Sequence, residues 1–74
     1  MKHASLNVKK FTVKEDAGYR VRVESWEVLT PKGLYAIDMI QETLDKDGNV
    51  ADTSTYNFHM TKDEIKTLCE GLMA

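Results

Sequence analysis

The sequence predicts an α+β fold: a four-stranded antiparallel meander sheet of order 1-2-3-4, with one C-terminal helix packed on one face. Three observations indicate this fold. Segments that alternate apolar and polar residues are separated by short turns rich in Gly, Asp, Asn or Pro. One register of the last two segments brings three apolar pairs together. A capping sequence then precedes a helical pattern near the end of the chain. The 74 residues are expected to form a single domain, 1–74.

The segment 19–29 is expected to be a central strand. Its first half alternates apolar and basic residues, but the alternation slips at Glu24-Ser25. A β-bulge there would turn the later apolar side chains back toward the core. The residues that face the core would then be Val21, Val23, Trp26 and Val28. Without that bulge, Trp26 turns outward beside Arg20 and Arg22, which would create a stacking and cationic surface suited to single-stranded nucleic acid.

The segment 6–14 is expected to be the first strand. Its apolar residues lie at even positions before Lys9-Lys10 and at odd positions after them, so a bend is expected there. Residues 15–18 form the turn, in which Gly18 takes a positive φ. If Glu15 and Tyr19 flank this loop, two apolar pairs form on the inward face and one like-charge pair on the other. These pairs are Phe11–Val23, Val13–Val21 and Lys14–Arg20.

The segments 34–44 and 50–60 are expected to be the third and fourth strands, after turns at 30–33 and 45–49. A tight turn before the third strand predicts two pairs with the central strand, Val28–Tyr35 and Trp26–Ile37. A four-residue loop before the fourth strand predicts three further apolar pairs, Met39–Tyr56, Ile37–Phe58 and Tyr35–Met60.

The segment after residue 60 is expected to be a helix. Thr61 and Glu64 have the spacing of a capping box, with Thr61 as N-cap. An apolar stripe follows at helical spacing and is expected to cover the inward face of the sheet. Cys69 belongs to this stripe and is therefore expected to be a buried core thiol. The stripe consists of Ile65, Leu68, Cys69 and Leu72.

Composition excludes several classes of protein. A hydrophobic content of 42% with 30% charged residues is typical of a soluble globular chain. No apolar run approaches the roughly 20 residues of a membrane span, and the first residues lack the apolar region of a secretory leader. The chain has one cysteine, so it forms no internal disulfide, which favours a cytoplasmic location.

The sequence shows no constellation of catalytic residues, and we expect neither enzymatic activity nor a cofactor. The segment 45–49 resembles the opening of an EF-hand calcium loop, but Val50 and Tyr56 stand where that loop needs glycine and glutamate. His59 is isolated, whereas zinc sites need three or four ligands. We therefore expect no metal site.

The outer face of the sheet is the candidate binding surface. The net charge of −2 argues against a general nucleic-acid binder, but the charge is uneven: residues 1–32 carry seven Lys/Arg and four Asp/Glu (+3), and residues 33–74 carry three and eight (−5). A face with this mixture suits a protein partner of complementary charge. The predicted binding residues are Lys10, Lys14, Arg20, Arg22, Asp38, Ile40, Glu42, Asn57 and His59.

The run Phe58-His59-Met60-Thr61-Lys62-Asp63-Glu64-Ile65, followed by Leu68, resembles the last strand and capped helix of the transcriptional positive-cofactor family of single-stranded-DNA-binding proteins. The order of four strands and a C-terminal helix is also similar. This resemblance covers about 15 residues and the order of elements. It implies single-strand binding on the sheet and dimerisation, with phosphate contacts from Lys10, Lys14, Arg20 and Arg22.

These observations favour a small non-catalytic module that acts by protein–protein contact through its exposed sheet face or a sheet edge. The alternative is a single-stranded nucleic-acid-binding protein that uses the basic face of the first two strands. A homodimer through the outer face or the helix is a further expectation. By analogy of fold alone, such small domains are frequent among phage and mobile-element accessory proteins that inhibit host machinery.

Overall fold

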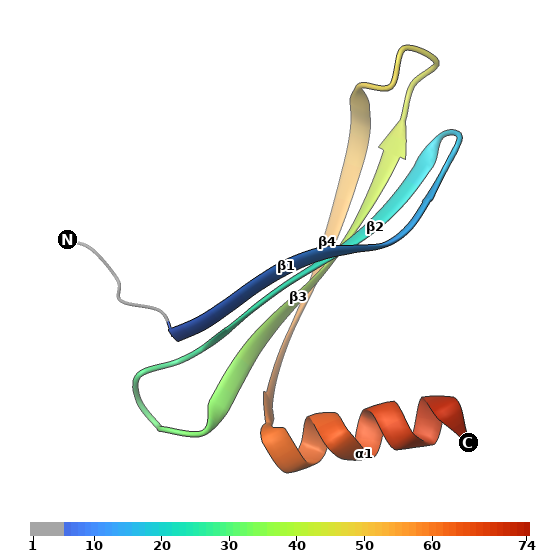
Figure 1. Ribbon diagram of the computed structural model, residues 1–74. Helices are drawn as coiled ribbons and strands as arrows, with labels where there is room; N and C mark the ends of the chain where they lie inside the picture. The colour runs from blue at the N-terminus through green and yellow to red at the C-terminus, as the bar shows by residue number, and fades with distance from the viewer. Residues whose placement is uncertain (1–5) are drawn as a thin grey trace, which may run out of the picture.

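The computed structural model describes residues 6–74 and confirms the predicted α+β fold (Figure 1). The elements are β1 (Leu6–Asp16), β2 (Tyr19–Glu27), β3 (Leu34–Leu44), β4 (Val50–Thr61) and α1 (Lys62–Met73). The four strands form one antiparallel sheet of order β1-β2-β3-β4. Residues 1–5, on which the expectation of no secretory leader rests, lie outside the described residues.

The turn between β1 and β2 is one residue shorter than expected. Asp16 pairs with Tyr19, so the turn consists of Ala17 and Gly18, and Gly18 has the expected positive φ of +85°. A bulge between Thr12 and Lys14 restores the register, and Phe11 pairs with Val23 as predicted. The predicted Val13–Val21 and Lys14–Arg20 pairs are wrong because Val13 is the extra residue of the bulge. Lys14 pairs with Val21, and Glu15 pairs with Arg20.

The predicted bulge in β2 is also wrong. β2 pairs with β3 without interruption from Tyr19–Thr43 to Glu27–Tyr35, and the Val28 N–H donates to the Leu34 carbonyl at 2.9 Å. The connection, residues 29–33, is therefore one residue longer than the predicted turn at 30–33, which reverses the side-chain parity at this end of β2. Trp26 consequently pairs with Ala36, not with Ile37, and lies on the face of Arg20 and Arg22.

The register of β3 and β4 is as predicted. Met39 pairs with Tyr56, Ile37 with Phe58, and Tyr35 with Met60. The Asp45 N–H donates to the Asn49 carbonyl and the Gly48 N–H to the Asp45 carbonyl, and the Asp45 carboxylate accepts from two further backbone N–H groups of the turn. The apolar pattern and the turn chemistry agree here, so this hairpin could be predicted from local sequence.

Helix α1 begins with the predicted capping box. The Glu64 N–H donates to Thr61 Oγ1 at 3.2 Å, and the Thr61 N–H donates to Glu64 Oε1 at 2.8 Å. Two backbone donors that would otherwise lack partners are thus satisfied by side chains.

Substitution of Thr61 by alanine is expected to lower the free energy of unfolding by about 1 kcal/mol, because one N-terminal donor of the helix loses its acceptor. Urea unfolding followed by circular dichroism measures this loss. Thr61→Ser keeps the hydroxyl and is the matched control. Equal losses in the two variants would contradict the role of the cap.

The predicted packing of α1 across the inward face of the sheet is not observed. The helix contacts β4 (Figure 1) and lies beyond the end of the strands. Ile65 is half-buried, but Leu68 and Leu72 are exposed. Cys69 is exposed as well, so the expectation of a buried thiol is wrong. The capped junction starts the helix directly at the strand end, and this direction carries its apolar stripe away from the sheet.

Burial is concentrated on the face that was expected to be the outer one. Among residues 6–74, the buried apolar residues are Val23, Ala36 and Ile40, and Glu42 is the buried charged residue. Ala36, Ile40 and Glu42 share the face of Arg20 and Arg22. The opposite face carries most of the large apolar side chains but leaves them largely exposed. No helix among the described residues is long and apolar enough to cross a membrane.

Candidate functional site

The face of the sheet that carries Arg20 and Arg22 is here called the polar face. Because β2, β3 and β4 pair without a shift through their central parts, residues of one parity on each strand share this face. It includes Lys10, Thr12 and Glu15 from β1; Arg20, Arg22, Glu24 and Trp26 from β2; Ala36, Asp38, Ile40 and Glu42 from β3; and Thr53, Thr55, Asn57 and His59 from β4.

Four charged residues on β2 and β3 form a cluster at the centre of the polar face. Arg20 Nε donates to Glu42 Oε1 at 2.6 Å. Arg22 binds the same carboxylate through both oxygens, with Nε–Oε1 at 3.1 Å and Nη2–Oε2 at 3.3 Å. Arg22 Nη1 also donates to Glu24 Oε2 at 3.1 Å. We call these residues, Arg20, Arg22, Glu24 and Glu42, the arginine–glutamate cluster.

The electrostatics of the cluster follow from these contacts. Hydrogen bonds from Arg22, then from Arg20, lower the pKa of the Glu42 carboxyl from its ordinary value, although desolvation opposes this shift. Hydrogen bonds to Glu42, then to Glu24, raise the pKa of Arg22. Glu42 is 6% exposed, whereas the two arginines are half-buried. Both guanidinium groups are therefore already engaged by carboxylates of the same chain.

Several predicted binding residues surround this cluster on the polar face. Asn57 Nδ2 donates to Asp38 Oδ1 at 2.6 Å, which links β4 to β3. Lys10 lies opposite Glu24, and His59 lies opposite Ala36; both side chains are exposed. Ile40 is buried between Arg22 and Thr55 in the register, so it forms part of the floor of this face.

Lys14 does not join the other predicted binding residues. The bulge at Val13 places it opposite Val21, on the other face of the sheet. Its Nζ lies 5.9 Å from the centroid of the Tyr19 ring and 3.3 Å from Asp16 Oδ2. This cation–π contact and the ion pair keep the lysine at the β1–β2 turn.

The structure adds Glu24 and Trp26 to the polar face. Neither was among the predicted binding residues. The expected bulge at Glu24-Ser25 had assigned Trp26 to the core. The signal that could have placed both is the unbroken parity of Arg20, Arg22, Glu24 and Trp26 along β2. Trp26 is half-buried and lies opposite Ala36, which is 1% exposed.

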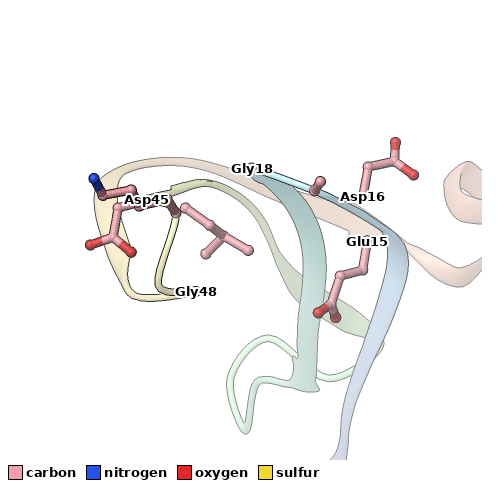
Figure 2. A pocket seen from close by; sticks show the side chains of 8 residues that line it. Glu15, Asp16, Gly18, Asp45 and Gly48 are labelled. Atoms are coloured by element: carbon pink, nitrogen blue, oxygen red, sulfur yellow. The ribbon is translucent and has the colours of Figure 1, made fainter.

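A hollow of about 500 Å³ lies between the β1–β2 and β3–β4 turns (Figure 2). Glu15, Asp16 and Asp45 line it, but Glu15 and Asp16 point in different directions from β1. The Asp45 carboxylate already accepts from the N–H groups of Asp47 and Asn49. Among the described residues, no group of three or more His, Cys, Asp or Glu side chains is arranged to hold a metal ion.

Comparison with known proteins found no matching family model, no matching curated protein and no matching solved structure. The similarity of residues 58–65 to the positive-cofactor family therefore stays a prediction.

Proposed function

We propose that this protein is a non-catalytic binding module that recognises a partner protein through its polar face. The observation that carries the proposal is the arginine–glutamate cluster, in which one buried carboxylate, Glu42, binds both Arg20 and Arg22. A surface whose cations are paired internally has little free positive potential to offer a polyanion. It instead presents fixed, alternating charges that a complementary protein surface can match.

The charge balance of the whole polar face supports this reading. Three basic residues, Lys10, Arg20 and Arg22, share it with four acidic residues, Glu15, Glu24, Asp38 and Glu42. Such a mixture contributes to the choice of partner and to its orientation. The expected role as an inhibitor of host machinery rests on fold analogy and stays a prediction.

Trp26 is the expected anchor of this interface. Tryptophan is enriched among the residues that dominate binding energy at protein interfaces. Here it is half-buried on the polar face, and its position beside Ala36 limits the freedom that it would lose on binding. Charged side chains of the same face would form the rim around it.

Partner binding is expected to depend on Trp26. Affinity capture from an extract of the native source identifies the partner, and titration calorimetry with the purified partner then measures the affinity. Trp26→Ala is expected to weaken binding about tenfold or more. Lys66→Ala, on the exposed helix, is the matched control and should bind as the wild type does. Unchanged affinity of a folded Trp26→Ala variant would contradict the proposed interface.

Single-stranded nucleic acid is the second candidate ligand, because Trp26 shares the polar face with Arg20 and Arg22. The ion pairs to Glu42 weigh against it. Fluorescence anisotropy of a labelled oligonucleotide at low and moderate salt separates the two functions. We expect no tight binding. Tight binding that weakens steeply with salt, and that Arg22→Ala reduces, would replace the protein-binding proposal.

A further inference from the structure

The second face of the sheet, here called the apolar face, leaves many large apolar side chains uncovered among residues 6–74. Its apolar members are Phe11, Tyr19, Val21, Val23, Tyr35, Ile37, Met39, Tyr56, Phe58 and Met60. Polar residues share this face, and they include Lys9, Lys14, Asp16, Ser25, Glu27, Gln41, Thr43, Asp52 and Ser54. Phe11 is 52% exposed, and Met39, Tyr56 and Phe58 are exposed to similar degrees. Of the whole set, Val23 alone is buried. Monomeric proteins rarely leave a contiguous apolar surface of this kind open to water.

Most of the apolar stripe of helix α1 is also uncovered. Ile65 is half-buried beside the sheet, but the rest of the stripe, Leu68, Cys69 and Leu72, is exposed, and Leu72 is 75% exposed. A helix of 12 residues is marginal in water unless its apolar stripe packs against something. Ile65 lines a hollow of about 350 Å³ together with Tyr35 of the apolar face, and Asn7, Lys9, Ser25 and Lys62 line the rest of it.

The dimensions of the chain indicate that it lacks a second layer. The Cα radius of gyration is 14.5 Å, whereas a compact chain of this length has about 11 Å. A chain of this size buries too little surface to be stable unless its main apolar surfaces are covered.

We infer that a second copy of this chain covers the apolar face, with α1 of each copy packed across the apolar face of the other. Seven large side chains on the two surfaces are on average about half exposed: Phe11, Tyr19, Met39, Tyr56, Phe58, Leu68 and Leu72. At roughly 200 Å² for each fully exposed side chain, they offer about 700 Å² per copy. A stable interface buries about 800 Å² per partner.

A second copy fits better than an unrelated protein because the chain carries both halves of the interface. It has a sheet face without a helix and an apolar helix without a sheet. In a dimer with a two-fold axis, the helix of each copy covers the apolar face of the other, so both surfaces are buried in both copies. The dimer would leave the two polar faces directed outward, so we expect a partner protein to bind with two sites per dimer.

Sedimentation equilibrium of the purified protein tests the dimer without any partner. We expect a mass of twice the 8.4 kDa of one chain. Phe58→Glu, on the apolar face of β4, is expected to raise the dissociation constant at least 100-fold or to give monomers. Thr55→Glu, on the polar face of the same strand, should stay dimeric. A folded wild-type monomer at high micromolar concentration would overturn the inference.

Disulfide cross-linking tests the arrangement without a disruptive substitution, which matters if Phe58→Glu fails to fold. The natural chain, with its exposed Cys69, is coexpressed with a longer-tagged chain that carries Met39→Cys and Cys69→Ser. Mild oxidation should join the two chains. The matched control replaces Met39→Cys by Thr55→Cys, on the polar face, and should join them poorly.

The cross-linking outcomes distinguish the alternatives. A mixed product with Met39→Cys supports the helix of one copy lying on the apolar face of the other. A product formed only between two Cys69 residues would place helix against helix and overturn this arrangement. Because neither experiment includes a partner protein, the dimer and the proposed binding function can fail separately.

Discussion

Ala36→Leu is expected to destabilise the sheet by about 1–3 kcal/mol, because it inserts three carbon atoms where no space is left. Ala36 is 1% exposed, which makes it the most buried residue of those named in the core. Its neighbours on the polar face are Trp26 and His59. A leucine would displace the indole from β3 or force a rotamer that conflicts with the strand.

Thermal unfolding at fixed protein concentration measures this effect. For a domain of this length, a loss of 2 kcal/mol lowers the Tm by roughly 8–16 °C. Ala51→Leu, at an exposed position of β4, is the matched control and should change the Tm little. The emission of Trp26 should also shift to longer wavelength in Ala36→Leu if the indole becomes more exposed. A Tm equal to that of the wild type would contradict the packing of Trp26 on Ala36.

Glu42→Gln is expected to lower the stability at neutral pH and to remove part of the acid dependence of unfolding. The pKa of Glu42 is lowered in the folded protein by the hydrogen bonds from Arg22 and Arg20. The folded state therefore binds this proton less readily than the unfolded state. The stabilisation is complete above the ordinary pKa of 4.5 and is lost as the pH falls through the lower pKa of the folded protein.

Denaturant unfolding of both proteins across pH 7 to about pH 3 checks this prediction. The difference in unfolding free energy should be largest at neutral pH and should decrease below about pH 4.5, where the wild type also loses the charge of Glu42. Glu24→Gln is the matched control: Glu24 pairs with Arg22 alone and is more exposed, so its effect should be smaller. Parallel pH profiles for wild type and Glu42→Gln would contradict the role of the cluster.

The features that depend on local sequence could be predicted without the structure. The β3–β4 register follows from three apolar pairs and a turn whose Asp45 bonds its own backbone. The start of α1 follows from the spacing of Thr61 and Glu64. The cap and the turn rest on contacts between residues close along the chain, and the apolar pairs follow from strand periodicity once the turn is placed, so propensity and pattern lead to one answer.

The candidate site could be predicted in part. The alternation of Arg20 and Arg22 with valines placed them together on one face, and most of the predicted binding residues do share it. The ion pairs with Glu42 join residues 20 positions or more apart and have no local signal in the sequence. The sequence therefore indicated a face of mixed charge, whereas the structure shows that Arg20 and Arg22 are paired with Glu42 on that face.

By itself, the sequence determined the number, order and type of the elements, the β3–β4 pairing and the helix cap, because these rest on periodicity and short-range hydrogen bonds. Tertiary structure decided which face holds Trp26, where Lys14 lies and where the helix points. The first two depend on single-residue differences in turn length and on a bulge, and each such difference reverses the parity of a strand. The third depends on the junction of β4 and α1, which starts the helix at the strand end and leaves most of its apolar stripe exposed.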